Sequence, residues 1–185
     1  MKYYSSKPRK RIALLFVICL AFAACHKPGK TNNQINKIEI ATGGGLKKGE
    51  FIAIRIDSTL AINYYGGYNA KLKGYYSGKI THAFWDTLNL KLKAINFKKL
   101  DTTQYLGMDA QMAEVIFYWN NQKKHITRPI DEDADTVAQA LSWIAWSYRH
   151  VALQKLKDTV KFGTTYQYLK PLIAIKGTIK LPPDK

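Results

Sequence analysis

Hydrophobic and polar residues alternate along much of the first half of the chain. In the stretch EFIAIRID, residues 50–57, Ile52, Ile54 and Ile56 occupy every second position and the residues between them face the other way. This period of two is typical of a β-strand with one face on a core and one in water. Three further segments alternate in the same way and are predicted as strands of one antiparallel meander: 35–41, 60–64 and 68–80.

The spacing changes to a helical period after residue 80. Phe84, Leu88, Leu92 and Ile95 follow one another by four, four and three positions, so they share one stripe of a helix predicted over residues 81–96. A second helix is predicted over residues 131–150, with Asp133 or Asp135 as its N-cap. From Gly163 onward the pattern is mixed, and a short edge strand is expected there.

A hairpin is predicted between the two helices. Residues 113–130 contain two runs of β-branched and aromatic residues around the pair Asn120-Asn121, a turn sequence that tolerates positive φ. The order is therefore strands, helix, hairpin, helix. It predicts a single α+β domain over residues 35–185, in which an antiparallel sheet of meander plus hairpin carries two helices packed on one face.

The N-terminal residues have the pattern of a targeting signal. Four basic residues between positions 7 and 11 precede thirteen apolar or small residues, 12–24, too few to span a bilayer and typical of a secretory signal. The signal ends in Phe-Ala-Ala-Cys, which resembles the lipobox of bacterial lipoproteins. That resemblance implies cleavage before Cys25 and attachment of a diacylglycerol to its thiol. We therefore expect a signal peptide over residues 1–24 and a flexible tether over 25–34, against the alternative of an ordinary signal that ends near a cysteine.

The residues after Cys25 also suggest a destination. Position 26 is His, where an Asp would resemble an inner-membrane retention signal of some bacteria. Acidic residues, which mark surface export in some lipoproteins, are absent near Cys25. Both analogies favour the bacterial outer membrane, with the lipid-anchored domain facing the periplasm.

The cysteine count and the net charge limit which kinds of site and which kinds of partner we expect. The chain has two cysteines; cleavage would remove Cys19 and acylation would consume the thiol of Cys25, so no redox pair or zinc-thiolate site is expected. Five of the 29 basic residues and none of the 13 acidic ones precede Cys25, which leaves 24 against 13 and a net charge of +11. Such a surface attracts an anionic glycan, a lipid headgroup or an acidic envelope protein, although it also serves simply to keep a domain dissolved. The export signal argues against nucleic acid.

Several features together resemble a known family. They are an early strand, a Gly-rich loop, a strand that ends in Asp, the stretches NYYGG and GYYSGKI, and a late hairpin before a last helix. Over residues 35–150 this arrangement resembles uncharacterised lipoproteins and exported proteins of Bacteroidota that carry a domain of unknown function. The resemblance implies no assigned activity.

The sequence contains no motif typical of a catalytic site, a metal site or a cofactor site. The histidines at positions 26, 82, 125 and 150 are far apart, and the Gly-rich loop 43–49 lacks the spacing of a phosphate-binding loop. Asp109 and Glu114 remain a conceivable carboxylate pair. The run DEDAD matches calcium-loop positions at Asp131, Asp133 and Asp135 but lacks the Gly and Glu that such a loop needs, and acids before a helix also favour its dipole. We predict no catalytic residue, metal or cofactor from these patterns.

The most unusual stretch is YYGGYNAKLKGYY, residues 64–76. Tyrosine rings stack on sugars and suit wet interfaces, and lysines pair with phosphate or carboxylate. We interpret Tyr75, Tyr76, Lys71 and Lys73 as a candidate ligand-binding set, against the alternative that the rings merely cover a sheet.

The first hypothesis is therefore an envelope lipoprotein that binds a partner. The second is a small envelope hydrolase whose site is built from dispersed residues, which a pocket around His82, His125 or the Asp109–Glu114 pair would favour.

The lipobox yields a direct test. Replacing Cys25 with Ser removes the acylated thiol, so the Cys25→Ser chain should move from the membrane pellet to the soluble fraction. Cell fractionation measures this shift, with the wild-type chain as control. A variant that stays in the pellet as before would contradict the lipoprotein interpretation.

Overall fold

The computed structural model describes residues 34–43, 49–103, 111–130 and 135–169. The chain divides into two units, and all of the described residues belong to the second, Asn33–Lys185. Cys25, the predicted signal peptide, most of the predicted tether and the tail after 169 lie outside the described residues. The described elements follow in the order β1 Lys37–Gly43, β2 Ile52–Asp57, β3 Ala61–Gly66, β4 Gly74–Lys79, α2 His82–Ala94, η1 Phe97–Lys99, β5 Met112–Trp119, β6 Gln122–Pro129, α3 Thr136–Ala145, η2 Ser147–His150, β7 Leu153–Lys155 and η3 Tyr166–Tyr168.

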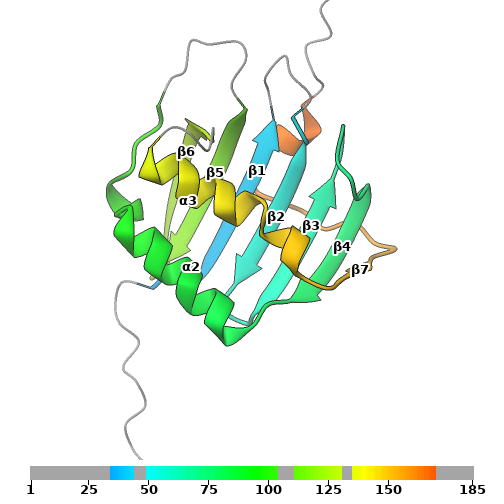
Figure 1. The fold of residues 1–185 in the computed structure, drawn as a ribbon, viewed down its shortest axis with the longest axis horizontal. Coiled ribbons are helices and arrows are strands. Elements are labelled where there is room, and N and C mark those ends of the chain that lie inside the picture. Colours follow the sequence, from blue (N-terminus) through cyan, green and yellow to red (C-terminus); the bar gives the residue numbers. More distant parts are fainter. Residues whose placement is uncertain (1–33, 44–48, 104–110, 131–134, 170–185) are drawn as a thin grey trace, which may run out of the picture. The chain divides into compact units, whose positions relative to one another are not determined.

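The seven strands form one antiparallel sheet in the order β6-β5-β1-β2-β3-β4-β7. Both helices, α2 and α3, cross the same face of this sheet (Figure 1). The meander β1 to β4 and the hairpin β5–β6 join because β5 pairs with β1. The predicted α+β class, with two helices on one face of an antiparallel sheet, is therefore confirmed.

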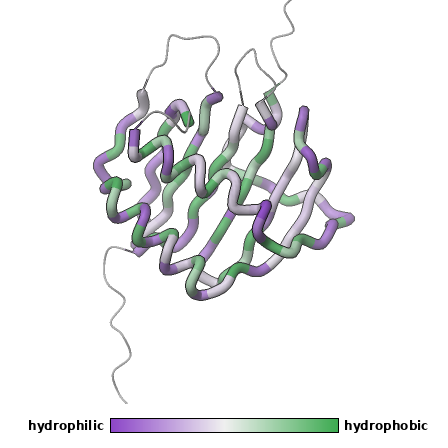
Figure 2. The backbone as a smooth tube through the Cα atoms, viewed as in Figure 1, coloured by the Kyte–Doolittle hydropathy of each residue, from purple (hydrophilic) through white to green (hydrophobic). Residues whose placement is uncertain are grey.

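The core lies between the sheet and the two helices. Ile52, Ile54 and Ile56 all point to this side and are buried, as their alternation predicts. Leu88 and Leu92 of α2 meet them from the helix layer. Along the tube, hydrophobic positions concentrate in the central strands, while hydrophilic ones gather toward the turns and the outer edges (Figure 2). Burial of this apolar face is the main driving force for the fold.

The helix and hairpin ends follow local chemistry. The side chain of Thr81 caps α2 by accepting from the Phe84 N–H, and the side chain of Asp135 caps α3 by accepting from the Ala138 N–H at 2.8 Å. Of the two acids expected to cap the second helix, Asp135 does so, while Asp133 lies outside the described residues. Asn120 and Asn121 both adopt positive φ between β5 and β6, as a two-residue hairpin turn of the favoured hand requires.

The predicted strand over residues 68–80 is wrong in its first half. Strand β4 begins only at Gly74, and residues 67–73 form a turn that folds back onto β3. The hydroxyl of Tyr64 donates to the carbonyl oxygen of Leu72 at 3.0 Å, which closes this turn. The alternating pattern predicted a strand here although Leu72, which lies between two lysines, is not a core residue: it is 38% exposed.

The C-terminal part also departs from expectation. Helix α3 stops at Ala145 and gives way to the 3₁₀ turn η2, so one continuous helix to residue 150 is wrong. A short edge strand is present as β7, Leu153–Lys155, and the described residues after Gly163, 164–169, contain no strand. Residues 156–169, called the strap below, pass behind the sheet on the face without helices (Figure 1).

The register builds ordered rows of side chains on the strap side of the sheet. One row crosses it as His125, Ile116, Glu39, Arg55, Asn63, Ser77 and Gln154. The neighbouring row ends in the directly opposed pair Tyr65 and Tyr75. This second face is therefore polar and aromatic, in contrast to the aliphatic face under the helices.

Gly66 is required by the turn that follows β3. A Cβ at this position would overlap the carbonyl oxygen of Leu72 and stand 2.6 Å from the hydroxyl of Tyr64. We expect Gly66→Ala to lower the free energy of unfolding by about 3 kcal/mol or more, because backbone must shift. Denaturant unfolding measures the loss.

Gly49→Ala is the matched control. The nearest atoms that a Cβ at Gly49 would meet belong to the flexible side chain of Gln111, at 3.2 Å, so this variant should change stability by less than about 1 kcal/mol. Equal stability losses in the two variants would contradict the close packing of residues 67–73 on Gly66.

Candidate functional site

Two buried carboxylates on the strap side of the sheet organise this face. Glu39 and Glu114 are 1% and 3% exposed. The side chain of Glu39 pairs with Arg55 at 3.0 Å and Lys37 at 3.2 Å, and it also accepts from the Gly163 N–H. A buried carboxylate is tolerated only when it is paired and hydrogen-bonded, so these contacts determine where the strap docks.

The second carboxylate holds the end of the strap. One oxygen of Glu114 accepts from the backbone N–H groups of Thr165 at 2.6 Å and Tyr166 at 2.9 Å, and from the Thr165 hydroxyl at 3.1 Å. Its other oxygen lies 2.9 Å from Nε2 of His125, whose side chain is 51% exposed. The structure thus brings together two residues that were predicted as separate candidates.

Docking of the strap assembles a cluster of tyrosine rings. Tyr65 and Tyr75 lie side by side on neighbouring strands with ring centroids 4.7 Å apart, and Tyr168 of the strap packs on Tyr65 at 5.5 Å. Partial burial, together with hydrogen bonding to Tyr168, raises the pKa of Tyr75 to about 12. The Tyr168 residue is 51% exposed, so the cluster reaches the surface.

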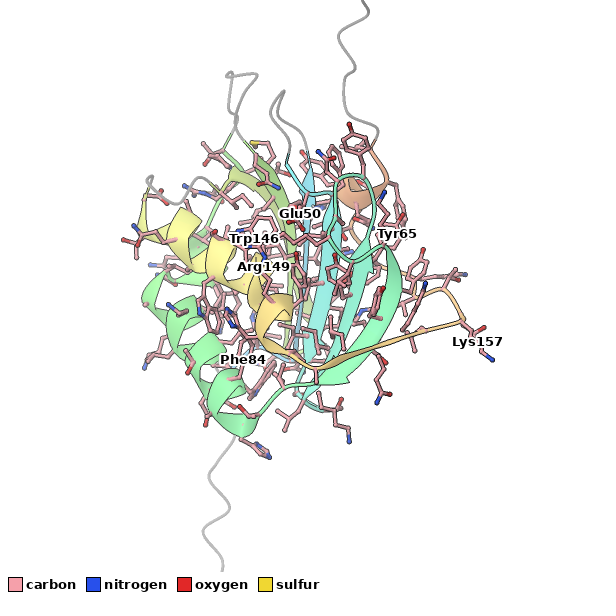
Figure 3. The ribbon with its side chains drawn as sticks, turned by 45° about the vertical axis from the view of Figure 1, so that its right-hand side comes forward. Glu50, Tyr65, Phe84, Trp146, Arg149 and Lys157 are labelled. Carbon is pink, nitrogen blue, oxygen red and sulfur yellow. The ribbon has the colours of Figure 1, made fainter. Side chains whose placement is uncertain are left out.

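Two basic residues are exposed near this tyrosine cluster along the chain. Lys73 is exposed just before β4, two residues from Tyr75, whereas Lys155 of β7 pairs in register with Tyr76 and so shares its face of the sheet, opposite to Tyr75. Lys157 projects from the outer bend of the strap, on the side of the molecule where Tyr65 is labelled (Figure 3). We call Tyr65, Tyr75 and Tyr168, with Lys73 and Lys157, the tyrosine–lysine surface.

The four residues predicted as a ligand set do not share one face. Tyr75 points to the strap side and belongs to the tyrosine–lysine surface. Tyr76 points to the opposite, helix side, where its ring contacts the buried Tyr64 with a centroid distance of 5.9 Å. Lys71 and Lys73 lie exposed in the turn 67–73 and not on a strand. Alternation along β4 itself separates the two tyrosines, because neighbouring strand residues point to opposite faces.

A polar cluster that the sequence did not indicate lies where the end of α3 meets the sheet (Figure 3). The hydroxyl of Tyr148 donates to Glu50 at 2.7 Å, and a guanidinium nitrogen of Arg149 lies 3.1 Å from the same carboxylate. The guanidinium also covers the ring of Trp146 at 4.3 Å. Burial first, then hydrogen bonding to Glu50, raises the pKa of Tyr148, which keeps the phenol neutral as the donor.

Aromatic side chains also line the helix layer. Phe84 of α2 stacks on Trp143 of α3 with centroids 4.8 Å apart, and the ammonium of Lys91 lies 5.1 Å from the Trp143 centroid. The repeated Trp in the stretch WIAW, three positions apart, was a signal for this set. All three rings of Phe84, Trp143 and Trp146 are partly buried against the core, which gives them a packing role.

The remaining candidates show no convergence in the part of the chain that the structure describes. His82, at the start of α2, and His150, at the end of η2, are exposed, whereas His125 lies on β6. Asp109, Asp131 and Asp133 lie outside the described residues, and Asp135 is occupied by its cap and by Arg128 at 3.1 Å. The described residues contain no group of three or more histidine, cysteine or acidic side chains that could hold a metal ion.

Comparison with known proteins adds a family without an activity. A family model described as Domain of unknown function (DUF6438) matches residues 36–149, which include six of the seven strands, both helices and both buried carboxylates. The strap begins after the matched residues. No curated protein matches the chain. Among the described residues, no helix has the length and apolar character needed to cross a membrane.

The docking of the strap through Glu114 can be tested. Replacing Glu114 with Ala leaves the Thr165 and Tyr166 N–H groups without an acceptor, which should cost about 1–3 kcal/mol in the free energy of unfolding. It should also make the strap the first site of cleavage in limited proteolysis.

Asp86→Ala, an exposed acid on α2, is the control and should leave both measurements unchanged. A Glu114→Ala chain with an unaltered cleavage pattern would show that the strap is held by other contacts.

Proposed function

Because the chain belongs to the DUF6438 family, which has no assigned activity, we propose a function from the geometry: this is an envelope lipoprotein whose domain binds an anionic partner. The protein is anchored through acyl chains, such as palmitate, on Cys25, and its domain faces the periplasm from the bacterial outer membrane. The proposed binding region is the tyrosine–lysine surface.

The observation that carries this proposal is the cluster of Tyr65, Tyr75 and Tyr168. Three neighbouring rings from two strands and the strap pack together; Tyr65 and Tyr75 are half-buried and Tyr168 is 51% exposed. Amphipathic rings that remain partly wet are typical of binding surfaces, because one end of each ring is apolar and the other forms hydrogen bonds. Structural packing alone does not require this exposure.

Charge supports an anionic partner. The chain after Cys25 carries a net charge of +11, and Lys73 and Lys157 of the tyrosine–lysine surface are exposed. A membrane-anchored protein meets such anions as lipid headgroups, lipopolysaccharide phosphates, acidic glycans and acidic envelope proteins. Electrostatic attraction to them raises the association rate and weakens with added salt.

One observation favours the alternative, a small envelope hydrolase. An exposed imidazole held by a buried carboxylate, as in His125 with Glu114, is the arrangement that orients a general base. Yet the same carboxylate already accepts three hydrogen bonds from the strap, which accounts for its burial without catalysis. The geometry therefore supports the binding module better.

The two tyrosines that follow Gly74 separate binding from folding. In the Cys25→Ser chain, Tyr75→Ala should weaken binding to phosphatidylglycerol vesicles or lipopolysaccharide at low and high salt, because it removes a ring of the surface. Tyr76→Ala should instead lower the free energy of unfolding by about 2–4 kcal/mol, as large-to-small changes against a core do. Binding and thermal unfolding are measured for each variant.

The lysines test the electrostatic part. Lys73→Gln with Lys157→Gln should reduce binding mainly at low salt, because the Debye length falls from about 10 Å at 0.1 M to about 3 Å at 1 M. The pair Lys93→Gln with Lys99→Gln, exposed on the helix side, is the matched control. If the Lys73/Lys157 variant binds as well as wild type at every salt concentration, this surface is not the binding site.

A further inference from the structure

A shallow depression opens beside the tyrosine–lysine surface, where β4 meets the edge strand β7. It has a volume of about 440 Å³ and is lined by Ser77, Gly78, Lys79, Ala152 and Gln154. This volume falls within the range of about 300–1,000 Å³ that is typical of ligand pockets. Among these described lining residues, Lys79 is the only charged one.

The lining side chains continue the ordered rows of the sheet. Ser77 lies directly opposite Gln154 on β7 and opposite Asn63 on β3, so a hydroxyl and two amides face the same side in one row. Such groups both donate and accept hydrogen bonds, which matches the hydroxyl groups of a sugar.

Strand β4 places three kinds of group in line on this side. Tyr75, Ser77 and Lys79 occupy alternate positions and therefore share the strap-side face. At about 3.3 Å per residue, the aromatic ring and the ammonium are attached roughly 13 Å apart. That separation exceeds one sugar ring and suits two or three linked ones.

We propose that this stripe, from Tyr75 through the depression to Lys79, binds an acidic oligosaccharide. One sugar ring stacks on Tyr75, the hydroxyls of the chain bond to Ser77, Asn63 and Gln154, and a carboxylate or phosphate of the sugar pairs with Lys79. This inference rests on the proposed function and names the class of its anionic partner.

The composition of the stripe distinguishes a glycan from a lipid headgroup. A headgroup phosphate on a bilayer is recognised by clustered positive charge, whereas here a single lysine follows a hydroxyl and amides. The chemistry along β4 therefore matches a ligand with many hydroxyl groups and few charges.

The test uses the full-length protein in a zwitterionic detergent without a sugar headgroup. Tri-galacturonic acid is the acidic probe and maltotriose the neutral one, both titrated by calorimetry. We expect the acidic trisaccharide to bind at least tenfold more tightly, and Lys79→Gln to remove that preference, since it deletes a charge-assisted contact. Gln154→Ala should weaken both sugars by roughly three- to tenfold.

Lys93→Gln on α2 is the matched charge control and should leave both affinities unchanged, and thermal unfolding of every variant shows that the fold is intact. Absence of trisaccharide binding, or equal affinities for the two sugars, overturns the glycan assignment. If the chain binds anionic vesicles through Tyr75 but ignores the acidic trisaccharide, the proposed function stands and this inference fails. If it binds neither, both fail.

Discussion

The structure of the domain depends on the ion pairs and hydrogen bonds that allow two carboxylates to be buried in it. Glu39 and Glu114 lie on the interior strands β1 and β5 and are almost completely buried, where ionised groups without partners would be strongly destabilising. Arg55, Lys37 and His125 supply part of the compensation from the sheet itself. Backbone N–H groups of the strap supply the rest, so the strap docks where these acceptors are.

That constraint connects stability with the surface. The hydrogen bonds of Glu114 fix Thr165 and Tyr166, and Tyr168 follows two residues later. Its ring then completes a cluster that Tyr65 and Tyr75 begin on the strands. The contacts that satisfy a buried charge thereby position an exposed aromatic group. The matched family region, 36–149, carries the two acids and two of the rings, while the third ring comes from the chain beyond it.

The two faces of the sheet differ in composition and in how they are covered. The helix side is aliphatic at its centre and is closed by α2 and α3, which drives folding through burial. The other side carries a row of charged and amide groups beside paired tyrosines, and the strap covers only part of it. A face that is polar, ordered by strand register and incompletely covered is a rigid platform on which recognition groups can be held at fixed spacing.

Local pattern was sufficient for most of the fold. Periods of two and of near four residues predicted the meander, both helices, the hairpin at Asn120-Asn121 and a cap by Asp133 or Asp135, because these depend on neighbours close in sequence. Tertiary contacts decided the rest. Tyr64 and Gly66 hold residues 67–73 as a turn, the β5–β6 hairpin brings His125 to Glu114, and Glu114 meets the strap across 51 residues of sequence. Nothing local encodes such partners: a buried carboxylate and the N–H groups that satisfy it are matched only when distant segments reach the same place in space.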